Sequence, residues 1–318
     1  MDILSSNDYK ANMINVVEPY ISQFSDESFF ERKSGERICY EKYVQPGAKS
    51  CVVISHGFSE CSMKYHEAAY YFLKSGNNVY IINHRGHSKS FRMASDPSLV
   101  HFVDYRELIL DFVYFAEKIV KPENPCIPCY VYAHSMGGAI AASAMEDRPD
   151  LFDKAVLTSP MMSINTGNIP KWFAVLFTNM KVTMGHGTDY FTGQGPFDGT
   201  RDFEHSTSAG QARYDYYFDR CLENQFMQTW GSSYTCSREL NRLANHTIQI
   251  DRCKKVKTPV LLFSAGSDNA VTDRGQRIFI DNIDNGKIVV VPGVRHEIFT
   301  ADDETLKHYW SEIFKFFG

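Results

Sequence analysis

Apolar and polar residues alternate along most of the chain between segments typical of strands and segments typical of helices. Short apolar runs rich in β-branched residues occupy residues 51–55, 79–83, 130–133, 155–158, 259–263 and 287–291. Stretches with helical patterns lie between them, at residues 62–75, 105–120, 136–147, 273–283 and 303–317. Residues 29–44 suit a hairpin around Ser34-Gly35. This alternation predicts an α/β fold with a mostly parallel central sheet flanked by helices.

The alternation stops after Pro160 for about ninety residues and resumes at residue 259. The interrupting stretch has helical apolar segments, many aromatic residues and a glycine-rich segment at residues 185–199. One fold interrupted once accounts for this pattern. We therefore expect a first core part at residues 1–160, a mainly helical cap inserted at residues 161–250, and a second core part at residues 251–318.

Composition excludes some classes of function. The 318 residues are 43% hydrophobic and 22% charged, which is enough apolar material for a large core. A net charge of −5 without a long Lys/Arg run argues against nucleic acid as a partner. Residues 1–20 lack the basic start and apolar centre of a signal peptide, and no apolar run is long enough to span a bilayer. We expect a cytoplasmic protein whose eight cysteines stay reduced.

Residues 133–137 read Ala-His-Ser-Met-Gly and lie between a predicted strand and a predicted helix. Small residues two positions before and after the serine are typical of a strand–turn–helix elbow that exposes a nucleophilic serine. Ala133 stands where such turns usually carry glycine, and it adds only a methyl group. Ser135 is therefore the predicted nucleophile.

A serine hydroxyl needs a general base, and the base needs an orienting acid. Asp268 follows the predicted strand at residues 259–263, and His296 follows the one at residues 287–291. Both residues are thus expected in loops at the carboxyl ends of strands, where open α/β sheets assemble their sites. Asp273 is the alternative acid, and we interpret it as a charge near a helix N-terminus.

Acyl transfer also requires two backbone N–H donors that hold the oxyanion. The amide of Met136 is one candidate, and the loop after residue 55 supplies Phe58 as the other. Gly57 is expected to give this loop conformational freedom to turn an amide toward the site. We interpret His56 as a residue that braces the loop rather than as a base.

Five segments together resemble the α/β-hydrolase group that contains bacterial lysophospholipases and monoacylglycerol lipases. They are His-Gly-Phe-Ser-Glu at 56–60, Asn-His-Arg-Gly-His-Ser-Lys-Ser at 83–90, Ala-His-Ser-Met-Gly-Gly at 133–138, Gly-Ser-Asp at 266–268 and His-Glu-Ile-Phe at 296–299. The resemblance covers roughly residues 50–160 and 255–318. Ser88 stands where the family often has a second glycine.

The resemblance implies an α/β-hydrolase fold and a Ser135–Asp268–His296 triad with Phe58 and Met136 at the oxyanion. It also implies a carboxylic ester hydrolase without a cofactor. Lysophospholipid and monoacylglycerol are the substrates that it suggests, and peripheral contact with membranes follows by analogy. Oligomeric state is not implied.

The predicted cap carries Met and aromatic residues at helical spacing, which form adaptable apolar surfaces. Met161, Trp172 and Phe173 are the candidates for an acyl-chain groove above Ser135. Packing inside the cap is the alternative interpretation of the same residues.

Two other functions compete with ester hydrolysis. Acidic residues in the cap segment are either a solvated face or a site for the amine of a peptide, as in a proline iminopeptidase-like enzyme of this fold; they are Asp215, Asp219 and Glu223. The second rival is a non-catalytic ligand receptor, which usually has a damaged triad. We expect no metal site. Further ligands or a redox context would have to accompany the CxxC at residues 126–129 or the pair His84 and His87, and the sequence shows neither.

Overall fold

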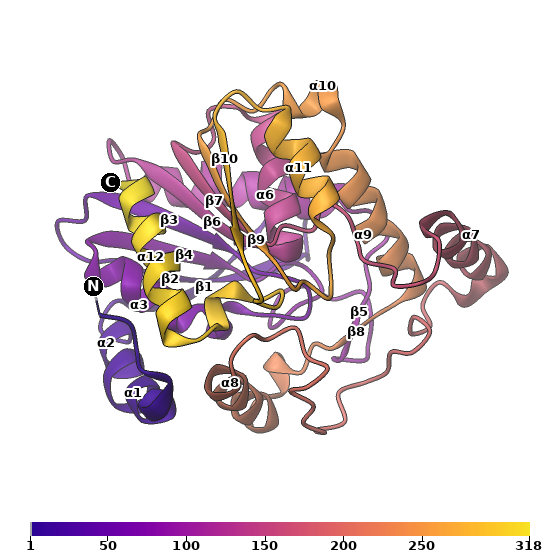
Figure 1. Ribbon diagram of the computed structural model, residues 1–318, viewed down its shortest axis with the longest axis horizontal. Helices are drawn as coiled ribbons and strands as arrows, with labels where there is room; N and C mark the ends of the chain where they lie inside the picture. The colour runs from indigo at the N-terminus through magenta and orange to yellow at the C-terminus, as the bar shows by residue number, and fades with distance from the viewer. Residues whose placement is uncertain (1) are drawn as a thin grey trace.

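The computed structural model describes residues 2–318, and a twisted β-sheet runs through its centre (Figure 1). The strands of this sheet are β1 Ser25–Glu31, β2 Arg37–Tyr43, β3 Ser50–Ser55, β4 Asn77–Ile82, β6 Cys129–His134, β7 Lys154–Thr158, β9 Val260–Ala265 and β10 Gly286–Val291. Their order across the sheet is β1-β2-β4-β3-β6-β7-β9-β10. A separate two-stranded ribbon pairs β5 Leu99–Val100 with β8 Gly231–Ser232.

Only the β1 edge of the sheet is antiparallel. β1 pairs with β2 as a hairpin, β2 pairs antiparallel with β4, and the remaining neighbours run parallel. Gly35 in the hairpin turn has a φ of 78°, a conformation that favours glycine. The predicted α/β class with a mostly parallel sheet is therefore confirmed.

Helices cover both faces of the sheet. They are α1 Tyr9–Asn12, α2 Glu18–Ile21, α3 His66–Lys74, α4 Arg106–Tyr114, α5 Lys121–Glu123, α6 Ser135–Asp147, α7 Lys171–Lys181, α8 Gln211–Glu223, α9 Tyr234–Thr247, α10 Ile250–Cys253, α11 Asp273–Asp281 and α12 Asp303–Phe317. Successive side chains of β3 point to opposite faces, as strand geometry requires. Val52 joins an apolar core with α3 and α12, whereas Val53 joins one with α4 and α6.

Between β7 and β9 the chain adds no strand to the main sheet in residues 2–318. This stretch forms α7, α8 and α9 together with long loops, and Figure 1 shows α7 and α8 at the periphery of the molecule. α7 contacts α9, and α8 contacts the N-terminal α1. There Arg213 of α8 lies 4.6 Å from the ring centre of Tyr9 and 2.8 Å from a carboxylate oxygen of Glu67.

Candidate functional site

Ser135 lies in the sharp turn between β6 and α6. Its φ of 49° falls in the left-handed region, which is strained for a residue with a Cβ. A Cβ added to Gly137 would lie 2.2 Å from the carbonyl oxygen of Ser55, and one added to Gly138 would lie 2.7 Å from Cβ of Pro160. Glycine at position 137 therefore lets α6 approach β3 closely, and glycine at position 138 lets it approach Pro160 after β7.

The structure brings Ser135, His296 and Asp268 into one hydrogen-bonded row. With the imidazole proton on Nδ1, His296 donates to Asp268 Oδ2 at 2.8 Å. Its Nε2 then accepts from the Ser135 hydroxyl, also at 2.8 Å. The three residues follow β6, β9 and β10, at the same edge of the parallel sheet. A hydroxyl paired with an oriented imidazole in this way is the arrangement that activates a serine as a nucleophile.

Asp268 is held in the charged form that orients His296. Its Oδ1 accepts hydrogen bonds from the backbone amides of Ala270 and Val271 at 2.8 and 2.9 Å. Burial alone would raise the pKa of Asp268, but the hydrogen bond from His296 and these two amides lower it below its usual value. The alternative acid, Asp273, begins α11 and forms an exposed ion pair with Arg277.

The two expected oxyanion donors come from the start of α6 and from the loop after β3. Met136 is the second residue of α6, so its amide precedes the first intrahelical hydrogen bond and is free to serve a ligand. Phe58 follows β3, and within residues 2–318 no protein acceptor pairs with its amide. These two amides are available as donors, and their catalytic role stays a prediction.

Position 57 needs glycine because a side chain would not fit there, rather than for the conformational freedom that we expected. Its amide donates to Glu60 Oε2 at 2.6 Å, and a Cβ at this position would lie 2.8 Å from the same oxygen. The space left by the missing side chain thus lets the buried Glu60 carboxylate reach the loop. Sequence reasoning did not single out Glu60, although its place in the His-Gly-Phe-Ser-Glu segment was a usable signal.

His56 has the contacts of a bracing residue. Its Nδ1 donates to the Gly57 carbonyl at 2.7 Å, and its Nε2 accepts from the His84 amide at 3.0 Å. Burial lowers the pKa of His56 to about 4, so the ring stays neutral near pH 7. It therefore joins the loop after β3 to the loop after β4.

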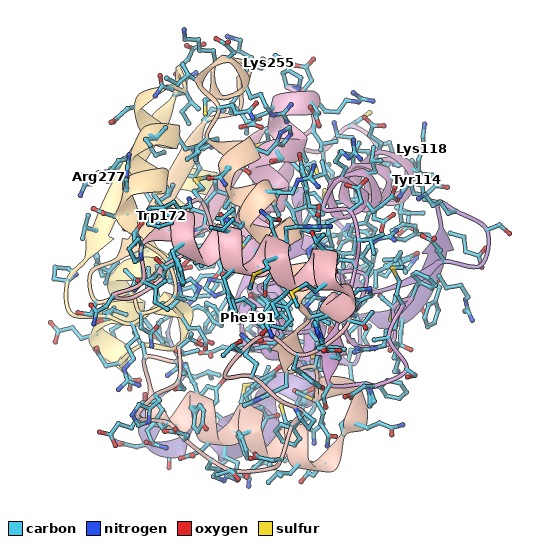
Figure 2. All side chains as sticks on the ribbon, turned by 90° about the vertical axis from the view of Figure 1, so that its right-hand side faces the viewer. Tyr114, Lys118, Trp172, Phe191, Lys255 and Arg277 are labelled. Carbon is cyan, nitrogen blue, oxygen red and sulfur yellow. The ribbon has the colours of Figure 1, made fainter. Side chains whose placement is uncertain are left out.

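Of the three expected acyl-groove residues, Trp172 and Phe173 lie side by side on α7, whereas Met161 is in the buried core. Met161 is buried in the core beneath the elbow, where its amide donates to the Ser135 carbonyl at 2.8 Å. Trp172 and Phe173 lie on α7, and Figure 2 shows this helix across the face turned to the viewer, with Trp172 at one end. The Trp172 side chain is 69% exposed. A cavity of about 360 Å³ lies instead beside α8, and none of the three residues lines it.

Within residues 2–318 no group of three or more His, Cys, Asp or Glu side chains is placed to hold a metal ion. Cys126 is exposed, whereas Cys129 is buried at the start of β6. His84 Nε2 pairs with the Ser55 hydroxyl at 2.9 Å. The same range contains no helix with the length and hydrophobicity needed to cross a bilayer.

Several known proteins resemble this chain in sequence and in fold. The family model described as "Serine aminopeptidase, S33" matches residues 46–304. The chain is 29% identical over 260 residues to lysophospholipase L2 of Escherichia coli K12, covering 79% of this chain and 75% of that protein. It is 25% identical over 289 residues to a monoacylglycerol lipase of Mycolicibacterium smegmatis, covering 90% of this chain and 95% of that protein.

A crystal structure of a soluble variant of monoglyceride lipase from Saccharomyces cerevisiae has a TM-score of 0.72 with this chain. The two sequences are 15% identical over 92% of this chain and 94% of the yeast chain, so this likeness speaks for the fold alone. The family match extends over most of the chain, from before β3 to the start of α12, and it includes the elbow and both loops that approach it. The chain therefore belongs to the serine aminopeptidase S33 family of α/β-hydrolases and is a hydrolase similar to lysophospholipases and monoacylglycerol lipases.

Proposed function

We propose that this protein hydrolyses carboxylic esters of long acyl chains, with lysophospholipid or monoacylglycerol as substrate. The observation that carries the proposal is the continuous row from the Ser135 hydroxyl through His296 to Asp268, joined by two hydrogen bonds of 2.8 Å. Similarity to a lysophospholipase and a monoacylglycerol lipase supports a lipid ester as the substrate.

In the first half of the proposed reaction, Ser135 Oγ attacks the ester carbonyl carbon while His296 Nε2 takes the hydroxyl proton. The carbonyl oxygen becomes an oxyanion and accepts hydrogen bonds from the amides of Phe58 and Met136. Asp268 stays ionised and stabilises the imidazolium that forms. His296 then returns the proton to the ester oxygen, the C–O bond breaks, and the alcohol leaves an acyl group on Ser135.

Water completes the proposed cycle. His296 Nε2 takes a proton from water as its oxygen attacks the acyl carbon, and the same two amides hold the second oxyanion. The bond to Ser135 Oγ breaks as His296 returns the proton to it. The fatty acid is released and the serine hydroxyl is restored.

We also propose that residues 161–250 act as a cap on a core formed by residues 1–160 and 251–318. The absence of a main-sheet strand between β7 and β9 supports this division. Exposed apolar side chains on α7 support contact of this cap with a lipid surface; they include Trp172, Phe173, Leu176 and Met180.

A fluorophosphonate probe tests the nucleophile. Wild type should be labelled, and Ser135→Ala should not, because the probe reacts only with an activated serine. Turnover of p-nitrophenyl esters should likewise collapse in His296→Ala. Equal labelling of wild type and Ser135→Ala would overturn the proposal.

An aminopeptidase is the second candidate, since the matching family carries that description. The acidic cap residues give it little support, because each has a basic partner and none lines the cavity beside α8. Asp215 and Asp219 pair with Arg201, and Glu223 pairs with Arg220. Turnover of alanine or proline arylamides in preference to acyl esters would favour this candidate.

A further inference from the structure

Helix α8 of the proposed cap rests on the first residues of the chain. Apart from the turn that follows it, the elements in most extensive contact with α8 within the described residues are α1 and the single helical turn Ser6–Asp8. Figure 1 shows α1 and α8 at the same end of the molecule. The family match begins at residue 46, so it does not account for this support.

One buried guanidinium joins α8 to the core and to the N-terminal segment at once. Arg213 of α8 is 4% exposed, and its Nε and Nη2 donate to the Glu67 carboxylate of α3 at 2.9 and 2.8 Å. Its Nη2 also donates to the Leu4 carbonyl at 3.1 Å, and its Nη1 donates to the Ser6 hydroxyl at 3.2 Å. A guanidinium carries five N–H donors in a fixed fork, so it binds these partners together in one geometry.

The N-terminal segment is itself tied to the core. The Ser6 amide donates to Asp303 Oδ1 at the start of α12, at 3.0 Å, and this oxygen lies 3.8 Å from the Arg213 guanidinium. The Tyr9 hydroxyl donates to Glu67 Oε2 at 3.0 Å, and Arg213 binds the same oxygen. These first residues therefore bridge α8 and the core.

Two more side chains of α8 meet the same segment. The Tyr216 hydroxyl donates to Glu18 Oε1 of α2 at 3.3 Å. Asp219 forms an ion pair with Lys10 of α1 at 2.7 Å, which is mostly exposed on the lysine side. Both residues follow Arg213 at intervals of three, and residues three apart are neighbours on a helix surface. One side of α8 thus faces the N-terminal segment over two turns.

Helix α8 also forms a wall of the cavity of about 360 Å³. The N-terminal segment contributes Tyr9 to this wall, and the core contributes Ser59 and Glu297. Ser59 follows the proposed oxyanion donor Phe58, and Glu297 follows the proposed base His296. The position of α8 therefore sets the width of a cavity that adjoins both loops of the proposed site.

We propose that the N-terminal segment is a latch that holds α8 against the core, and that Arg213 is the positioning residue through which the latch sets the grip of the cavity on a long substrate. The part that concerns substrate rests on the proposed ester hydrolysis. Without the guanidinium, α8 loses its buried anchor and keeps weaker contacts such as the pair of Asp219 with Lys10, which solvent screens. A helix held by fewer buried contacts opens locally more often.

Hydrogen exchange of the full-length protein, followed by mass spectrometry, tests the latch. In Arg213→Met the amides of α8 should exchange about tenfold faster than in wild type, whereas those of α6 in the core should not change. Arg220→Met is the matched control and should behave as wild type. Arg220 lies on the same helix and lines the same cavity, but its ion pair is with Glu223 of that helix.

A milder variant keeps the test valid if Arg213→Met does not fold. Tyr9→Phe removes the hydroxyl that donates to Glu67 and keeps the ring 4.6 Å from the guanidinium. Exchange in α8 should then rise about threefold, again without a change in α6.

Steady-state kinetics test the effect on substrate. In Arg213→Met the KM for a long-chain monoacylglycerol should rise about fivefold with kcat unchanged, because α8 no longer holds the cavity wall in place. Both constants for p-nitrophenyl acetate should stay at the wild-type values, since its acyl group is too short to reach α8. A general loss of structure would instead lower kcat for both esters.

The outcomes separate the latch from the proposed function. Unchanged α8 exchange in both Arg213→Met and Tyr9→Phe would overturn the latch, and so would an equal acceleration in α6. Faster exchange in α8 with an unchanged KM for the monoacylglycerol would overturn the positioning role of Arg213. A wild type that hydrolyses neither ester would contradict the proposed function, while the exchange rates would still decide whether the latch exists.

Discussion

Around Ser135 the backbone is packed so tightly that Gly137 leaves no room for a methyl group, whereas the Trp172 side chain of α7 is mostly exposed. The first region is made of strand ends and the start of a buried helix, and hydrogen bonds join its Ser135, His296 and Asp268 side chains. The second is a peripheral helix with apolar side chains on its surface. A reaction needs atoms held within fractions of an ångström, while a lipid surface needs only accessible apolar area. The two regions thus meet different physical demands.

Asp268→Asn should give the largest effect on the tightly packed region. An amide in place of the carboxylate fails to stabilise the imidazolium and favours the wrong tautomer of His296, so kcat should fall about 10⁴-fold. Steady-state turnover of a p-nitrophenyl ester measures this loss. Asp273→Asn is the control and should stay near wild type, because Asp273 pairs with Arg277 at the surface. Equal losses in the two variants would contradict the assignment of the acid.

Gly137→Ala should destabilise the fold by about 3 kcal/mol, since the new Cβ would meet the backbone of β3. Gly195→Ala is the matched change in the segment after α7, where a new Cβ would meet nothing within 4 Å. It should alter the free energy of unfolding by less than about 0.5 kcal/mol. Urea unfolding of both variants measures the difference between the regions. Similar losses of unfolding free energy in the two variants would show that the tight packing at the elbow does not contribute more to stability than the loop does.

Buried and exposed ion pairs should differ in their response to pH. His66 contacts Glu18 and Glu41 at 2.9 and 3.1 Å. Burial alone would lower the pKa of His66, but hydrogen bonds to the two carboxylates raise it to about 10. Wild type should therefore exceed His66→Gln in unfolding free energy by about 2 kcal/mol near pH 6. This advantage should shrink as the pH rises from 6.5 toward 10, because the native state alone retains the proton there.

Urea unfolding at several pH values measures this advantage. His205→Gln is the control, since His205 pairs with Asp202 on the exposed surface of the segment between β7 and β9. Solvent screens such a pair, so this variant should show no comparable dependence on pH. A His66 advantage that stays constant between pH 6 and pH 10 would rule out the charged pair as its source.

The smallest effect is expected from α7. The double variant Trp172→Ser with Leu176→Ser should bind phosphatidylcholine vesicles about fivefold more weakly, because it removes exposed apolar area. Turnover of a soluble short-chain ester should stay the same. Ile250→Ser, an exposed apolar residue outside α7, is the control for both measurements. Unchanged vesicle binding in the double variant would argue against contact between this helix and lipid.

Local sequence patterns were sufficient to predict those features of the site that depend on local geometry. The elbow needs small residues at set spacings around Ser135, and the acid and base must follow strands, so motifs and strand order predicted which side chains the structure brings together. The strand–helix alternation likewise predicted the mostly parallel sheet, because side-chain periodicity reflects which face of an element is buried.

Other features depend on contacts between residues far apart in the chain. No element was predicted before residue 29, because α1 and α2 are short and depend on partners in α3 such as His66 and Glu67. The expected groove residues illustrate the same limit. Met161 is buried and Trp172 is exposed, although helical spacing treats both as groove candidates.

The amino-acid sequence by itself determined the α/β class, the family and the identity of the side chains at the elbow, since each is encoded in short segments with their own spacing. Only the tertiary structure decided where the cavity beside α8 forms. Lys64, Thr207, Tyr217 and Glu297 come from four separate segments and meet only when α8 packs beside the core. The ion pairs of Lys64 with Glu60 and Glu297 are properties of that assembly, and no linear pattern contains them.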